Sequence, residues 1–133
     1  MVDLNETVSE MERIFKVVVG DQVSLRTSLD PGLGSIAGDK RKISSVVVNL
    51  FLAARDATPA GGELHVATSI LELEGPAAEQ WRLAPGRYVE LRIETRHEIQ
   101  IKKVAEILGD TGAAVMARKE RDLFVIAIAW PHF

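Results

Sequence analysis

Cysteine is missing from the sequence of 133 residues, and its absence excludes several kinds of chemistry. Without a thiol, the chain can form no disulfide, no thiolate metal site and no covalent intermediate on a cysteine. Proteins of the reducing cytoplasm rarely depend on disulfides, so this composition is consistent with a cytoplasmic protein, which is the location we expect.

Long apolar runs and an excess of basic charge are missing as well. No stretch reaches the roughly 20 apolar residues that a membrane helix needs, and the acidic, polar beginning of the sequence is unlike a signal peptide. The 16 Lys and Arg residues against 19 Asp and Glu residues give a formal net charge of -3. This balance provides no basic surface for a nucleic acid backbone, so we expect neither a nucleic acid partner nor a membrane segment.

Common catalytic and metal-binding patterns are also missing. The sequence has no Gly-x-Ser-x-Gly motif, and its histidines do not stand at metal-ligand spacing from carboxylates. His65 falls inside an expected strand and His132 lies close to the end of the sequence, which favours structural roles for both. We therefore expect no catalytic residue and no metal ligand.

What the sequence does contain is enough apolar material for one domain over residues 1–133. Hydrophobic periodicity predicts three helices, over residues 2–20, 40–58 and 98–112, and Asp39 should cap the second of them. Ile99, Val104, Ile107 and Leu108 would form the apolar stripe of the third helix, which Gly109 or Gly112 would end. Strands are expected over residues 22–30, 63–73, 87–96, 113–121 and 122–131, and residues 74–86, with two prolines, should be a polar loop.

These elements predict an α+β fold of two layers. One mixed sheet of about five strands, covered by three helices, would bury the apolar stripes of all the helices in an α/β sandwich. Residues 124–130 are apolar on both faces, which indicates a strand inside the sheet.

One segment, residues 49–64 with the sequence NLFLAARDATPAGGEL, carries a resemblance to a known family. It is similar to the pattern Asn-Leu-x-x-Asn-Ala-Arg-Asp-Ala-x-Pro-x-Gly-Gly of the catalytic ATP-binding domain of sensor histidine kinases, the GHKL ATPase fold. The matching residues are Asn49, Leu50, Ala54, Arg55, Asp56, Ala57, Pro59, Gly61 and Gly62. Residues 2–11, 28–50, 83–94 and 123–131 also resemble family segments, so the resemblance covers nearly the whole chain.

The resemblance implies an ATP site at Asn49, Asp56 and Thr95, but in vestigial form. In the family, a second Asn four residues after the first holds Mg²⁺, which needs oxygen ligands. Ala53 stands at that position here, and a methyl group coordinates no metal.

The adenine side of the implied site departs from the family too. The family's adenine-binding Asp falls on Thr95, and the nearest carboxylate, Glu94, should face the opposite side of its strand. The glycines that let the family's backbone cradle the nucleotide are absent between His97 and Gly109.

Taken with these departures, the resemblance implies a degenerate histidine-kinase-type domain in two-component or phosphorelay signalling. It would have lost or weak nucleotide binding, no cofactor and no catalysis of its own, and would be part of a longer signalling protein. Its partner would be a response regulator or a histidine kinase, which it would dock as a phosphotransferase-associated module. A homodimer would form through an N-terminal helical hairpin outside this sequence.

Two alternatives stay open on the same resemblance. One is a functional ATP-binding catalytic domain of a sensor histidine kinase, which would bind Mg-ATP through Asn49 and Asp56. The other is an anti-sigma-like interaction module, whose partner binding would not need nucleotide. His97 and Glu98 also resemble a phosphoacceptor box, but that box lies on a separate helical hairpin in the family, so this hypothesis is the less favoured one.

Overall fold

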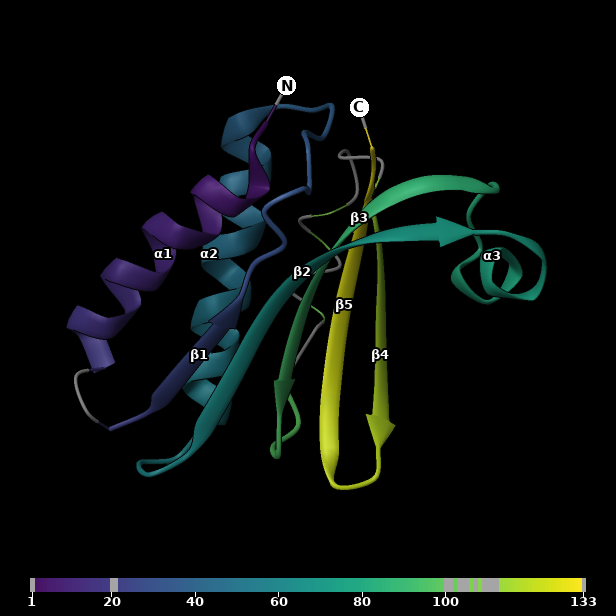
Figure 1. Cartoon of the computed structure of the whole chain (residues 1–133). Coiled ribbons are helices and arrows are strands. Elements are labelled where there is room, and N and C mark those ends of the chain that lie inside the picture. Colours follow the sequence, from purple (N-terminus) through teal and green to yellow (C-terminus); the bar gives the residue numbers. More distant parts are fainter. Residues whose placement is uncertain are drawn as a thin grey trace.

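The computed structural model describes residues 2–19, 22–99, 102, 106, 108 and 113–132. In these ranges, helices α1 (Leu4–Val19), α2 (Lys40–Ala57) and α3 (Gly75–Trp81) accompany strands β1 (Ser24–Ser28), β2 (Glu63–Leu73), β3 (Gly86–Thr95), β4 (Ala114–Glu120) and β5 (Leu123–Pro131). The strands form one five-stranded sheet in the order β1-β2-β3-β5-β4. β1 runs parallel to β2, and the other neighbours are antiparallel. Since α1 and α2 cover one face of this sheet (Figure 1), the predicted α/β sandwich with a mixed sheet is confirmed.

Helix α2 is held in place by a cap and by an apolar stripe. Asp39 Oδ1 accepts a hydrogen bond from the backbone amide of Arg41 at 2.8 Å, which confirms the predicted N-cap. The rings of Phe15 in α1 and Phe51 in α2 meet edge to face, with centroids 5.3 Å apart. The stripe that faces the sheet and α1 is buried and consists of Ile43, Val46, Val47, Leu50, Phe51 and Ala54.

Strands β3 and β5 form the centre of the sheet. Val89, Leu91 and Ile93 alternate along β3 and are fully buried on the face that α2 covers. Residues 125–130 of β5 are buried, and β5 lies between β3 and β4, inside the sheet as predicted.

One prediction is wrong: residues 74–86 contain helix α3 and are not a loop throughout. Prolines usually favour a loop, but Pro76 lies in the first turn of the helix, where its missing N–H costs nothing. Arg82, with a left-handed φ of 57°, ends the helix. Ala78 is buried against Tyr88 and Ala129, so α3 closes a small second apolar cluster at the far end of the β2–β3 hairpin (Figure 1).

The predicted helix 98–112 is described only in part. Lys102, Glu106 and Leu108 have helical backbone, and Ile99 and Leu108 are buried as the apolar stripe requires. Val104, Ile107, Gly109 and Gly112 lie outside the described residues. Across the described ranges, no helix has both the length and the apolar composition needed to cross a membrane.

Candidate functional site

A cavity of about 680 Å³ lies on the outer side of α2, next to the segment that follows β3. Two of the three residues implied by the resemblance, Asn49 and Asp56, meet residues of another segment there. The described residues that line it are Asn49, Leu52, Ala53, Arg55, Asp56, Ala57, Glu98, Lys102 and Glu106. Asn49, Ala53 and Asp56 reach it together because residues three and four apart share one face of a helix.

The amide of Asn49 is bound to its own helix. Its Nδ2 donates to the backbone carbonyl of Ser45 at 2.7 Å and approaches the Ser45 hydroxyl at 3.5 Å. One turn further along α2, at the position of the family's second Asn, the cavity wall is the methyl group of Ala53. At the two positions where the family pattern has Asn side chains, this cavity is therefore lined by one amide and one methyl group.

Asp56 stands at the outer rim of the cavity. Arg55 Nη2 lies 3.2 Å from Asp56 Oδ1, and their side chains are 38% and 71% exposed. An exposed pair of this kind contributes little to stability, because water and salt screen both charges. Arg55 and Asp56 therefore form an exposed pair near the end of α2.

Thr95 lies apart from this cavity. Its side chain is 1% exposed and its hydroxyl accepts a hydrogen bond from the backbone amide of His97 at 3.4 Å. Glu94 points to the other face of the sheet, as strand alternation predicts, and forms an ion pair with Arg92 at 3.0 Å. Of the three predicted site residues, the structure brings Asn49 and Asp56 together and leaves Thr95 in the core.

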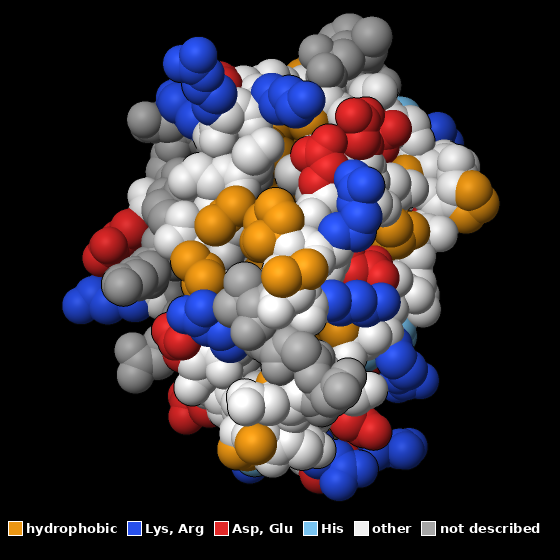
Figure 2. Space-filling view, turned by 90° about the vertical axis from the view of Figure 1, so that its left-hand side faces the viewer, with side chains coloured by type: hydrophobic (Ala, Val, Ile, Leu, Met, Phe, Trp, Pro, Cys, Tyr) orange, Lys and Arg blue, Asp and Glu red, His pale blue; other side chains and the backbone are white. Residues whose placement is uncertain are grey.

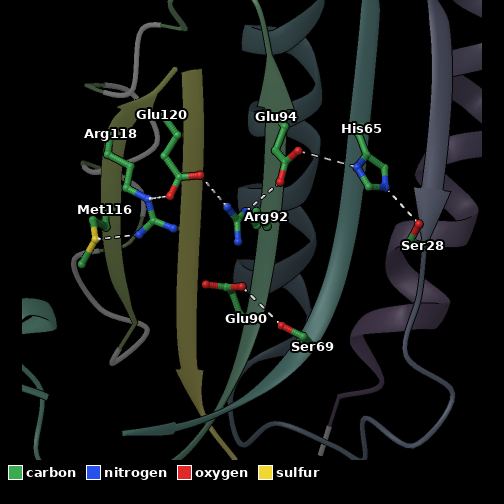
Figure 3. A network of polar contacts seen from close by, with 9 residues as sticks. All are labelled: Ser28, His65, Ser69, Glu90, Arg92, Glu94, Met116, Arg118 and Glu120. Carbon is green, nitrogen blue, oxygen red and sulfur yellow. Dashed lines mark hydrogen bonds and ion pairs between the residues drawn. The ribbon is translucent and has the colours of Figure 1, made fainter. Parts of the chain in front are cut away.

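The open face of the sheet, opposite α2, carries a polar network that includes Glu94 (Figure 3). Glu94 also lies 3.8 Å from His65 Nδ1, and His65 Nε2 is 2.9 Å from the hydroxyl of Ser28. On the other side, Arg92 reaches across β5 to Glu120 at 3.2 Å. Glu94 therefore belongs to this network, on the face of the sheet opposite the α2 cavity.

His97, the less favoured phosphoacceptor, lies beside a second cavity of about 420 Å³. Its side chain is exposed, and Arg96 and the turn at residues 59–63 are the other described residues of the lining. The backbone at His97 is a bend and not the helix start that the sequence predicts.

A third hollow, of about 590 Å³, lies on the outer side of α1 and is lined by Glu10, Arg13, Ile14 and Val17. Ile14 and Val17 are 56% and 85% exposed. Figure 2, which views the molecule from the side where α1 lies in Figure 1, shows hydrophobic side chains grouped together with charged ones around them. Grouped exposed apolar side chains are a feature of protein or membrane contact surfaces and of ligand-binding grooves.

Lys102 and Glu106 were not singled out from the sequence, and Glu98 was named only beside His97, in the less favoured phosphoacceptor box. Their spacing of four residues along a predicted helix was the available signal, since it places all three on one face. In the described part of the chain, no three His, Asp or Glu residues are grouped so that they could hold a metal ion.

Comparison with known proteins places this geometry in context. No protein-family profile matches the chain. It is similar to the sensor kinase CckA of Brucella abortus, with 26% identity over 95 residues, which make up 71% of this chain and 10% of that protein. The chain therefore spans about a tenth of the length of this curated relative.

Solved structures of histidine kinases share the fold. The nucleotide-free catalytic domain of histidine kinase ThkA superposes with a TM-score of 0.73 at 14% identity, covering 98% of this chain and 94% of that one. The mycobacterial sensor histidine kinase MprB gives 0.68 at 16% identity, covering 98% and 95%. ThkA in complex with the response regulator protein TrrA gives 0.77 at 14% identity, covering 99% and 41%. The chain has the fold of a histidine kinase catalytic domain.

Proposed function

We propose that the chain is a histidine-kinase-type domain of two-component or phosphorelay signalling that binds nucleotide weakly or not at all and serves to dock a protein partner. The observation that carries this proposal is the pair formed by Asn49 and Ala53 on the cavity wall. The amide nitrogen of Asn49 donates a hydrogen bond to the backbone carbonyl of Ser45. Ala53 has only a methyl group, which cannot coordinate a metal ion.

The ligand chemistry of magnesium supports weak nucleotide binding. Mg²⁺ requires oxygen ligands in near-ideal octahedral geometry and is held by few protein groups together with phosphate oxygens. The α2 side of the cavity supplies Asn49 Oδ1 at the inner position and the paired carboxylate of Asp56 at the rim. These residues do not fit a Mg-nucleotide site of the family's kind.

The charge around the cavity supports the same conclusion. Among the described residues of the lining, Asp56, Glu98 and Glu106 contribute three carboxylates against the two cations of Arg55 and Lys102. A triphosphate needs cations or backbone amides at its oxygens, and no glycine between His97 and Gly109 opens the backbone for such contacts. A net negative lining repels a polyanion and does not favour the binding of ATP.

A response regulator is the partner that the comparisons favour. ThkA, whose fold this chain shares over 99% of its length, has been solved in complex with the response regulator protein TrrA. The fold is thus compatible with such partners, and the described part of this chain exposes apolar side chains on α1 and α2 that a protein could cover. On this proposal, neither ATP nor Mg²⁺ is needed for docking.

The proposal is tested by measuring partner binding with and without nucleotide. The immobilised domain would be presented with a panel of purified receiver domains and sigma-factor-like proteins, each measured in buffer alone and with millimolar Mg-ADP. At least one receiver should bind, with the same dissociation constant in both conditions. If binding required Mg-ADP, the functional kinase alternative would replace this proposal, and if only sigma-factor-like partners bound, the interaction-module alternative would.

A further inference from the structure

A serine, a histidine and a glutamate lie in a row across three strands on the open face of the sheet (Figure 3). The hydroxyl oxygen of Ser28 in β1 is 2.9 Å from Nε2 of His65 in β2. Nδ1 of the same ring is 3.8 Å from Oε2 of Glu94 in β3. A nucleophile beside a base, with the base oriented by a third group, is the arrangement that makes a serine reactive in acyl transfer.

The pairing of β1, β2 and β3 produces this row. His65 lies directly opposite Glu94 in the antiparallel register of β2 and β3. The parallel register of β1 and β2 sets Ser28 opposite Ala67, two residues along β2 from His65. Ser28 and His65 are 37 residues apart in the sequence, so the position of His65 within a strand did not show which serine the sheet would bring to it.

The carboxylate of Glu94 is oriented through its other oxygen. Oε1 lies 3.0 Å from Nε of Arg92, and Nη2 of Arg92 lies 3.2 Å from Oε2 of Glu120. These contacts leave Oε2 of Glu94 to face the imidazole (Figure 3). The side chains of His65 and Glu94 are 27% and 25% exposed, so water screens their attraction less than it would on a fully exposed surface.

Glu94 determines which nitrogen of a neutral His65 carries the proton. A carboxylate attracts an N–H group and repels the lone pair of a bare nitrogen, so the proton belongs on Nδ1. Nε2 is then an acceptor, and in its short contact with Ser28 the hydroxyl must be the donor. Such a hydroxyl passes its proton to the ring as its oxygen attacks an electrophile. The separation of 3.8 Å exceeds a hydrogen bond, and contacts of this kind commonly tighten when the reacting complex forms.

We propose that Ser28 is an activated nucleophile that accepts acyl groups from small esters, with His65 as its general base and Glu94 as a positioning residue. As Ser28 Oγ bonds to the carbonyl carbon, its proton moves to His65 Nε2. The ester C–O bond then breaks, and the leaving group departs with the bonding electrons and takes the proton from the ring. Because Ser28 is exposed, solvent surrounds the reacting group, and only esters with good leaving groups are expected to react. This inference goes beyond the proposed function and does not depend on it.

A fluorophosphonate probe tests the activation of Ser28, because the serine oxygen attacks its phosphorus, fluoride leaves, and a stable phosphonate ester stays on the protein. The domain is incubated with the probe, and peptide mass spectrometry follows the modification of each serine over time. Ser24 is the internal control. It projects from the same face of β1, also two residues from the position opposite His65, but the imidazole is hydrogen-bonded to Ser28. Ser28 should react at least about 100-fold faster than Ser24, the lower end of what a positioned base contributes.

Variants separate the base from the positioning residue. His65→Gln should lower the rate at Ser28 to the rate at Ser24. Glu94→Gln should lower it about tenfold, less than in a buried triad, because the pair that it breaks is partly exposed. Glu72→Gln removes a carboxylate that is 59% exposed near the other end of β2, and it should leave the rate unchanged.

NMR of the ring nitrogens of His65 gives a readout that a merely structural role of Glu94 would not move. In the unchanged protein the neutral ring should carry its proton on Nδ1. In Glu94→Gln the neutral ring should shift towards the tautomer with the proton on Nε2, because the carboxylate that favours Nδ1–H is gone.

Equal rates of modification at Ser28 and Ser24 would overturn the inference. Modification of Ser28 that persists undiminished in His65→Gln would overturn it too, since the hydroxyl would then react without this base. The comparison of the two serines is made within the unchanged protein, so it stands even where a variant fails to fold, and circular dichroism checks the fold of each variant.

Discussion

Replacing Asn49 by alanine tests whether its amide is a structural group or a ligand of nucleotide. The change removes one hydrogen bond, from Nδ2 to the Ser45 carbonyl at 2.7 Å. At this half-buried position the bond is worth about 0.5–1 kcal/mol. Alanine recovers up to about 0.7 kcal/mol through its higher helix propensity. The free energy of unfolding should therefore change by no more than about 0.5 kcal/mol, the difference between these two terms.

The assay is urea unfolding followed by tryptophan fluorescence, combined with Mg-ADP titration of both proteins. Ser45→Ala is the matched control, because it removes only the hydroxyl contact at 3.5 Å and leaves the carbonyl in place. Because alanine also has a higher helix propensity than serine, this control should leave the free energy of unfolding unchanged or raise it by up to about 0.5 kcal/mol.

A loss of more than about 2 kcal/mol in Asn49→Ala would refute this reasoning, since a single half-buried hydrogen bond cannot account for it. A measurable Mg-ADP affinity that disappears in Asn49→Ala would refute it in another way. The amide would then bind nucleotide, and the functional kinase alternative would apply.

Three further changes test the frame that carries the site, each by urea unfolding. Asp39→Ala removes the N-cap of α2 and should cost about 1 kcal/mol; no loss would mean that the cap is dispensable. Phe51→Ala empties a fully buried position and should cost about 3–5 kcal/mol, so a loss below about 1 kcal/mol would contradict the packing of α1 on α2. Gly34→Ala should destabilise the fold by at least about 1 kcal/mol, because φ is +76° and the new Cβ would lie 2.7 Å from His132 Nε2. Gly32→Ala, with its nearest neighbour at 3.5 Å, is the control and should be close to neutral.

The sheet and the two long helices could be predicted because their residues repeat with the period of each element. The apolar run at residues 124–130 predicted a strand with no exposed face, and β5 lies inside the sheet. Alternation along β3 predicted that Thr95 and Glu94 face opposite sides of the sheet, and they do. Periods of two and 3.6 residues are local properties, so the sequence carries them directly.

Helix α3 could not be predicted in the same way. Seven residues are too few to show a helical period, and its one buried residue, Ala78, is held by Tyr88 and Ala129 from distant strands. Short helices depend on such tertiary contacts more than on propensity, which is why composition alone indicated a loop.

The candidate site was predictable on the α2 side only. Asn49 and Asp56 follow from one helical face, whereas Glu98 and Glu106 reach the cavity through the packing of another segment on α2. A resemblance in sequence marks positions but does not say which side chains gather around them. Thr95 occupies a site position in the family pattern, but in the structure it is buried and does not line the cavity.

The most direct test of the account is calorimetric titration of the domain with Mg-ADP and with a non-hydrolysable ATP analogue, accompanied by thermal unfolding at each concentration. A ligand that binds only the folded state at 100 times its dissociation constant stabilises that state by about 2.7 kcal/mol, which raises the melting temperature by several degrees. The account predicts no saturable heat and no rise in melting temperature up to millimolar nucleotide. A saturable heat with a matching rise would contradict it and show that Asn49 and Asp56 hold nucleotide despite Ala53.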